Sequence, residues 1–91
     1  GENVESSVEA VYGAYLDLQR SVTLGNWKLI LYPKISKARL FNIMRDPLEM
    51  NDLSNDPNRE KVIKRLFKHL LKLQKVNGDP LDLKTAFPKL D

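Results

Sequence analysis

The chain has 91 residues, of which 15 are basic and 12 acidic, so its net charge is +3, and 42% of its residues are hydrophobic. This length fits one small domain over residues 1–91, and the composition is that of a globular chain rather than a disordered one. With no cysteine and a single histidine, His69, the sequence excludes disulfides, cysteine nucleophiles, thiolate metal sites and metal sites built on two histidines. No apolar run approaches the roughly 18 residues that a membrane span requires, so no membrane partner is expected.

Three strands are predicted in the first half of the chain. Apolar and polar residues alternate over about 14–24, which is typical of a half-buried antiparallel strand. Gly25 and Asn26 then indicate a tight hairpin into a second strand at 27–32, which is rich in aromatic and branched residues. A third strand is expected at about 39–44.

The alternating segment has one polar exception on its apolar side. That side carries Tyr12, Ala14, Leu16, Leu18, Val22 and Leu24, and Arg20 interrupts it. Tyr15 falls on the opposite side from Tyr12, so a regular strand cannot direct both rings into one core. One of the two tyrosines is therefore expected to face a partner.

A long amphipathic helix is predicted at about 57–76. Asp56 fits its N-cap and Pro57 its first position, and Gly78 supplies the stop. An apolar stripe recurs at helical spacing: Val62, Ile63, Leu66, Phe67, Leu70, Leu71 and Leu73. Residues 79–91 are expected to form an extended tail. The order of elements predicts an α+β fold, a small antiparallel sheet of three to four strands with this C-terminal helix packed on one face.

Positive charge is concentrated in the predicted helix. Residues 59–75 hold seven bases and one acid, a local net charge of +6. This pattern fits either a patch for an anionic polymer or a solvated helix face whose lysine stems shield the apolar stripe. No aromatic residue lies among the lysines, which argues against stacking on nucleic acid, and no nucleic-acid partner is expected.

The side chains able to do chemistry form no recognisable active site. His69 has no carboxylate three or four residues away to orient it, so a surface role is favoured. The acidic residues before the helix do not have the spacing of an EF-hand: Asp46, Glu49, Asp52 and Asp56. Turn formation accounts for Asp46, and helix capping accounts for Asp56. The residues of this chain therefore predict no catalytic, metal-binding or cofactor-binding position.

Three aromatic residues of the predicted strands allow two interpretations. Trp27, Tyr32 and Phe41 can form a platform for stacking sugars, or they can be core residues on facing strands. The core interpretation is favoured, because aromatic residues on adjacent strands most often pack against one another.

Three short segments match, in order and spacing, the pattern of a known family. They are Gln19-Arg20 with Trp27-Lys28-Leu29-Ile30, then Leu40-Phe41-Asn42-Ile43 leading into Asp46-Pro47-Leu48-Glu49, then Asn51-Asp52-Leu53 ahead of the helix. Over about residues 8–76 the set resembles the C-terminal subdomain of the sulfatase family, within the alkaline phosphatase-like superfamily. The scaffold residues that the resemblance implies are Gln19, Arg20, Trp27, Lys28, Asp46, Pro47, Glu49 and Leu53. Two departures are visible, since Asn42 stands where the family usually has Asp and Thr23-Leu24 stands where an Arg-Thr pair is common.

The resemblance implies a non-catalytic C-terminal fragment of a sulfuric ester hydrolase. Sulfatases carry their active site in a large N-terminal domain, where Cys/Ser-x-Pro-x-Arg matures to formylglycine beside calcium or magnesium. This chain lacks that motif, so nucleophile and metal ligands are expected only in the absent catalytic domain. The fragment would pack against that domain, shape the rim of the substrate pocket, and share a periplasmic or secreted location.

Scaffold roles follow for the matched residues. Asp46 and Pro47 would form the turn after the third strand. Glu49 would accept backbone N–H bonds or pair with Arg45 or Lys28, and Leu53 would pack the chain onto the helix. Two alternatives stay open beside the sulfatase fragment. One is a stand-alone module that binds an anionic polymer through the basic helix face, and the other is self-association through surface that the absent domain would otherwise cover.

Overall fold

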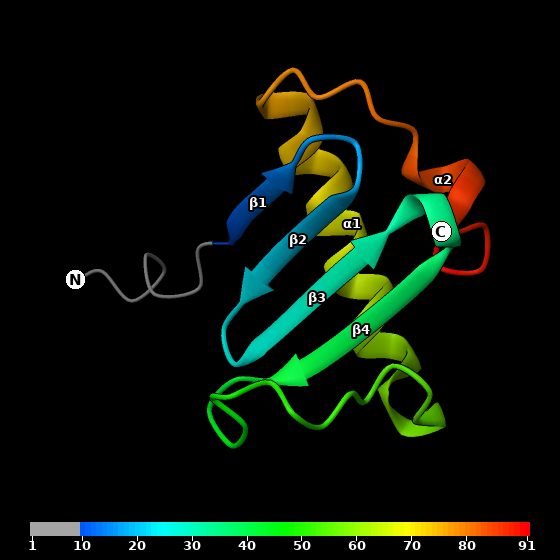
Figure 1. Ribbon diagram of the computed structural model, residues 1–91. Helices are drawn as coiled ribbons and strands as arrows, with labels where there is room; N and C mark the ends of the chain where they lie inside the picture. Colours follow the sequence, from blue (N-terminus) through cyan, green and yellow to red (C-terminus); the bar gives the residue numbers. More distant parts are fainter. Residues whose placement is uncertain (1–9) are drawn as a thin grey trace.

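Four antiparallel strands form a meander in which each strand pairs with the next along the chain (Figure 1). The computed structural model describes residues 10–91. The strands are β1 (Val11–Tyr15), β2 (Gln19–Leu24), β3 (Trp27–Tyr32) and β4 (Lys37–Asn42), and the helical elements are η2 (Pro33–Ile35), η3 (Pro57–Arg59), α1 (Glu60–Val76) and α2 (Leu83–Ala86). The helix α1 crosses one face of the sheet, so the predicted α+β class is confirmed.

The single strand predicted over residues 14–24 is wrong, because the chain reverses inside it. The strand β1 ends at Tyr15, a turn at 16–18 follows, and β2 begins at Gln19, which lies opposite Tyr15. Leu16, in this turn, has a φ of +52°. The pairing of Tyr15 with Gln19 places odd positions opposite odd ones, so the apolar alternation runs unchanged through the turn. Periodicity could therefore not reveal the reversal.

The turn between β2 and β3 falls at Gly25 and Asn26, as predicted. Leu24 pairs with Trp27 across it. Gly25 has a φ of +60°, a conformation that glycine adopts without the steric cost of a Cβ. The strand β3 then covers residues 27–32, the predicted range.

The strand β4 begins and ends two residues before the range 39–44 predicted for it. The chain returns directly after the short turn η2, so Lys37 already pairs with β3. At the other end, Asn42 Oδ1 accepts hydrogen bonds from the backbone N–H groups of Met44 and Arg45 at 3.1 and 3.2 Å. A side chain that closes on its own backbone in this way competes with strand pairing, and the strand stops.

The helix predicted at about 57–76 is present as the 3-10 turn η3 and the helix α1, which follow each other without a break. Asp56 Oδ1 accepts the N–H of Asn58 at 2.9 Å, and Pro57 occupies the first position, so the predicted start is confirmed. Just beyond the C-terminal end of α1, Gly78 has a φ of +65°, the left-handed conformation common after helices.

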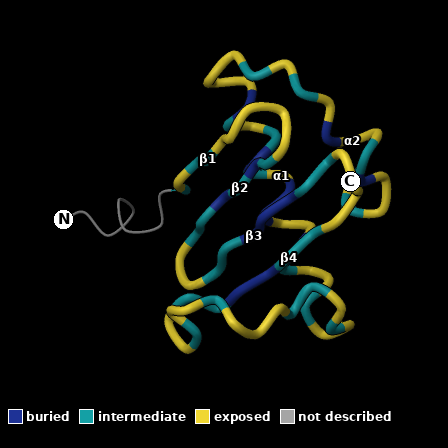
Figure 2. The backbone as a smooth tube through the Cα atoms, in the orientation of Figure 1, coloured by how far each residue is buried: buried dark blue, intermediate teal, exposed yellow. Residues whose placement is uncertain are grey.

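The hydrophobic core lies between the sheet and α1. Its buried residues come from the sheet, from α1 and from the C-terminal segment: Val22, Leu29, Leu31 and Leu40; Ile63, Leu66, Phe67 and Leu70; Leu83 and Phe87. In Figure 2 the buried stretches of β2, β3 and β4 lie in the middle of the sheet, whereas the turns and loops around it are exposed or partly exposed. The apolar stripe of the predicted helix therefore faces the apolar side of the predicted strands.

The prediction of an extended tail at 79–91 is wrong in part, because the tail contains the helix α2. Asp82 caps this helix by accepting the N–H of Thr85 at 3.1 Å. Leu83 and Phe87, one turn apart, are both buried in the core. A helix of four residues is too short to show a helical period in the sequence. Within residues 10–91, no helix has both the length and the apolar character to cross a membrane.

Candidate functional site

The two faces of the sheet are covered differently. The helix α1 lies behind the sheet in Figure 1, and among residues 10–91 no helix covers the front face, which we call the open face. The strand registers place on it Val11, Tyr15, Gln19, Ser21, Thr23, Lys28, Ile30, Tyr32, Lys37, Arg39 and Phe41. Ile30 and Phe41 are buried, although neither belongs to the core between sheet and helix. Their neighbours on the open face must therefore cover them.

An ion pair links the open face to the loop after β4. Lys28 Nζ lies 2.9 Å from Glu49 Oε2, and both side chains are about one-third exposed. Glu49 has a φ of +56°, so the backbone of this loop bends sharply where its side chain meets Lys28. Lys28 pairs with Phe41 across β3 and β4, which brings the lysine stem beside the aromatic ring. Of the two partners predicted for Glu49, Lys28 is therefore the one it contacts.

Exposed apolar side chains lie on β1 and in the loop after β4. In the loop after β4, Met44, Leu48 and Met50 are between 72% and 80% exposed. On β1, Val11 and Tyr15 are more than 60% exposed. A shallow groove lies on the open face, lined by Ile30, Tyr32, Ile35, Lys37, Arg39, Phe41 and Glu49. Apolar surface of this extent, mixed with charged residues, is typical of a surface that another protein surface covers.

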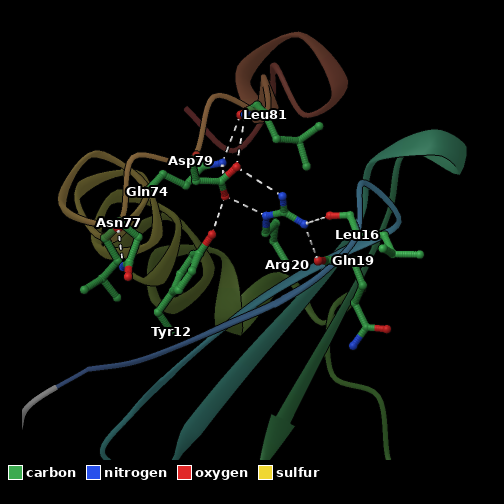
Figure 3. A network of polar contacts seen from close by, with 9 residues as sticks. Tyr12, Leu16, Gln19, Arg20, Gln74, Asn77, Asp79 and Leu81 are labelled. Atoms are coloured by element: carbon green, nitrogen blue, oxygen red, sulfur yellow. Dashed lines mark hydrogen bonds and ion pairs between the residues drawn. The ribbon is translucent and has the colours of Figure 1, made fainter.

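A buried polar network lies at the end of the sheet where the β1–β2 turn approaches the end of α1 (Figure 3). Arg20 Nε lies 2.6 Å from Asp79 Oδ2, and its terminal nitrogen donates to Asp79 Oδ1 at 3.1 Å. The Tyr12 hydroxyl and the Gln74 amide, the latter at 3.1 Å, also donate to Asp79. Arg20 donates in addition to the carbonyls of Leu16 and Gln19. One carboxylate thus joins β1, β2 and α1.

The network shifts the titration of its members. The guanidinium of Arg20 holds the pKa of the Asp79 carboxyl well below its usual range. Burial raises the pKa of the Tyr12 hydroxyl, and its hydrogen bond to Asp79 acts in the same direction. The Asp79 carboxylate and the Arg20 guanidinium are each engaged by several partners, so the network stabilises the packing of β1, β2 and α1.

The scaffold residues predicted from the family pattern fall into two places. Gln19 and Arg20 belong to the buried network, Gln19 through its backbone carbonyl. The others lie at the opposite end of the sheet and in the loop after β4: Trp27, Lys28, Asp46, Pro47, Glu49 and Leu53. Asp46 stabilises that loop, because its two carboxylate oxygens accept the N–H groups of residues 50 and 51 at 3.0 and 2.7 Å. Leu53 packs against the core, and its N–H donates to Leu40 O at 2.7 Å.

Sequence reasoning missed the partners of Arg20. The sequence patterns single out neither Asp79 nor Gln74, which both bind in this network. A signal was present, since an arginine on the apolar side of a strand needs a buried acceptor. Of the two tyrosines on opposite sides of the sheet, Tyr12 joins this network and Tyr15 is exposed.

The three aromatic residues considered for sugar stacking do not share a surface. Trp27 packs against the core on the α1 side of the sheet, whereas Tyr32 and Phe41 lie on the open face. Successive side chains of a strand point to opposite faces, so this separation follows directly from the register. The platform interpretation of all three residues is wrong.

A metal site and a basic surface are the two remaining candidates among the described residues. Within residues 10–91 there is no group of three or more histidine, aspartate or glutamate side chains that could hold a metal ion. The outer face of α1 exposes a row of bases, which we call the basic face: Lys61, Lys64, Arg65, Lys68, Lys72 and Lys75. One ion pair there joins Lys64 to Glu60 at 3.6 Å.

No protein-family model matches the chain, and no curated protein matches it either. The open face and the basic face are therefore the features from which a function can be inferred.

Proposed function

We propose that this chain is the non-catalytic C-terminal subdomain of a sulfatase-like hydrolase of sulfuric esters. In this proposal the open face packs against the catalytic domain, and the loop after β4 contributes to the rim of the substrate pocket. The observation that carries the proposal is the open face itself, where two buried apolar residues, Ile30 and Phe41, lie under a thin layer of amphipathic side chains. The order of the three sequence segments supports the choice of family.

The composition of the open face fits a partner within the same protein. Interfaces between domains of one chain are more polar than a core and combine apolar patches with charged residues. Met44, Leu48 and Met50 supply the apolar part, and the pair of Lys28 and Glu49, about one-third exposed, supplies the charged part. Since the loop after β4 carries four of these five residues, it is the segment that we place nearest to the catalytic domain.

Catalysis is assigned to the partner domain and not to this chain. The residues present do not fit the metal ion and formylglycine of the family, because the sequence lacks the Cys/Ser-x-Pro-x-Arg motif. The carboxylates of Asp46, Asp52 and Asp79 accept hydrogen bonds from the chain itself and serve the fold. We therefore assign no step of the hydrolysis to residues of this subdomain.

The proposal is tested in two stages. The reading frame that encodes the chain is expected to encode the Cys/Ser-x-Pro-x-Arg motif upstream, and a frame complete without it contradicts the proposal. The chain alone is expected to leave an aryl sulfate intact, with or without calcium, and hydrolysis by the chain would contradict it as well.

A binding experiment then tests the open face. The catalytic domain encoded upstream is expressed separately, and its association with the chain is measured by calorimetry. Leu48→Glu is expected to weaken association at least tenfold, because it places a charge in the proposed interface. Val76→Glu is the matched control, since Val76 is equally exposed but lies at the end of α1. Equal effects of the two substitutions would contradict a role for the open face.

The basic face supports a second candidate function, a module that binds a sulfated polymer. Its specific observation is a row of exposed lysines along α1 with one acid among them, Glu60. The triple substitution of Lys64, Lys68 and Lys72 by Glu is expected to abolish retention on heparin at low salt, whereas Lys89→Glu is not. Wild-type protein that passes through heparin unretained would exclude this function.

A further inference from the structure

A second groove lies at the end of the sheet, away from the buried network. It forms where the β2–β3 turn, the loop after β4 and the start of α1 meet. Its polar and aromatic lining includes Asn26, Trp27, Asn42, Arg45, Asn51 and Arg59. The proposed interface assigns no role to the two arginines, and Glu49 pairs with Lys28 rather than with Arg45.

Arg59 is held against the tryptophan of this groove. Its guanidinium carbon lies 5.3 Å from the centre of the Trp27 ring, within the range of a cation–π contact. Its Nε is shielded from solvent and has no hydrogen-bond partner in the described part of the chain; the nearest carboxylate oxygen, Asp56 Oδ2, is 3.7 Å away. The side chain as a whole is 41% exposed, so its outer nitrogens are accessible. An unsatisfied donor of this kind is rare in folded proteins and calls for an acceptor.

The two carboxylates that line the same groove, those of Asp46 and Asp52, accept hydrogen bonds from the chain itself. Both carboxylate oxygens of Asp46 accept backbone N–H groups, and Asp52 Oδ1 accepts two, from Leu40 at 3.0 Å and from Ser54 at 2.9 Å. Although burial acts against ionisation of Asp52, these bonds lower its pKa. Asn42 Oδ1 likewise accepts two N–H groups of the following turn.

Donors, in contrast, are left over. Across residues 10–91, Arg45 forms no ion pair and no side-chain hydrogen bond, and the Asn42 amide nitrogen has no hydrogen-bond partner. Two guanidinium groups and an amide thus line a groove in which backbone N–H groups engage both oxygens of Asp46 and one oxygen of Asp52. The unpartnered donors of the two arginines can be satisfied by an acceptor with a negative charge that a ligand supplies.

We propose that this groove binds a small oxyanion, a carboxylate or sulfate group, through Arg45 and Arg59 beside the ring of Trp27. Guanidinium groups bind such anions through paired N–H donors, which gives geometric specificity as well as attraction. Asp46 and Asp52 weaken the positive potential, so binding is expected in the millimolar range. The proposal rests on the groove alone and does not depend on the sulfatase assignment.

The single tryptophan makes the test direct. Because Trp27 is the only tryptophan of the chain, its fluorescence reports on this groove. Sodium sulfate and sodium acetate are titrated separately at an ionic strength held constant with sodium chloride. At least one of the two anions is expected to produce a saturable change, and the anion that does so identifies the ligand class. A response to neither anion would overturn the proposal.

Substitutions locate the binding. Arg45→Gln is expected to weaken binding at least fivefold, and Lys72→Gln, the matched control on the outer face of α1, is expected to leave it unchanged. Because Arg59→Gln also removes the contact with Trp27, binding to that variant is followed by the amide NMR shifts of residues 42–46 instead. Arg59→Lys, which keeps the charge but not the fork of donors, is expected to bind more weakly than wild type. Equal affinities of wild type, Arg45→Gln and Arg59→Gln would show that the anions act elsewhere and would overturn the proposal.

Discussion

Arg20 Nε lies 2.6 Å from Asp79 Oδ2. This ion pair joins the strand β2 to the segment just after α1, because Asp79 directly follows Gly78. The two side chains are only 8% and 7% exposed. A buried pair is sensitive to the loss of one member, because the remaining charge is left without a partner in a poorly solvated place. The pair closes a contact between residues that are 59 positions apart in the chain.

The first prediction concerns Asp79. Asp79→Ala is expected to lower the free energy of unfolding by about 3 kcal/mol, the usual order for breaking a buried ion pair. Urea denaturation followed by circular dichroism measures it. The matched control is Asp17→Ala, which removes an exposed partner of Lys34 and should cost less than about 0.5 kcal/mol. Similar losses in the two variants would mean that burial does not strengthen the pair.

The second prediction concerns pH. Arg20 holds the pKa of Asp79 well below the 3.8 of an unperturbed carboxyl, so Asp79 binds a proton more readily in the unfolded chain. Its stabilising contribution is therefore complete above about pH 5 and is lost as the pH falls below about 4. Asp79→Asn should be less stable than wild type at pH 7, and the difference in the free energy of unfolding should shrink between pH 5 and pH 3. A difference that stays constant over this range would contradict the lowered pKa.

The third prediction concerns the C-terminal segment. Phe87 is 6% exposed and belongs to the core, so Phe87→Ala is expected to cost about 3 kcal/mol through lost burial and a cavity. Thermal unfolding of the full chain measures it. Lys89→Ala, two residues further on and exposed, is the control and should change the free energy of unfolding by less than about 0.5 kcal/mol. If both variants unfold like wild type, the segment does not pack on the core.

The fourth prediction concerns the β2–β3 turn. Gly25 has a φ of +60°, and a Cβ there would meet no atom within 4 Å, so the backbone conformation alone penalises a side chain. Gly25→Ala is expected to lower the free energy of unfolding by about 1 kcal/mol. Gly25→Asn should cost clearly less, because asparagine tolerates the left-handed region. Equal losses for the two variants would point to a steric cause rather than a backbone one.

Much of the fold follows from local patterns. The turn at Gly25 and Asn26, the strand at 27–32 and the helix with its cap at Asp56 each depend on residues close together in sequence. The reversal after Tyr15 does not, because a turn of three residues between paired strands leaves the alternation in phase. The fold class could therefore be predicted, while the number of strands in its first part could not.

The sequence indicated some of the residues that form the open face and the buried network, but it predicted few of their contacts. Lys28 was one of two partners considered for Glu49, and the side of the sheet chosen by the loop after β4 decided between them. Arg20 was visible as an exception on an apolar side, but its acceptor lies beyond the far end of a long helix. The meeting of Arg45 with Arg59 at one groove likewise joins residues from two different elements.

The sequence by itself determined the charge, the absence of cysteine, the amphipathic helix and the apolar side of the strands, because composition and period are local properties. The tertiary structure alone decided which face of the sheet stays open and which charges meet. It also placed Leu83 and Phe87 in the core, where the sequence predicted an extended tail. These contacts depend on how elements pack across tens of residues, where burial and the pairing of polar groups outweigh local preference. The net charge of +3 does not show which charges are buried and which are exposed. Packing buries the ion pair of Arg20 and Asp79 and leaves the basic face of α1 exposed.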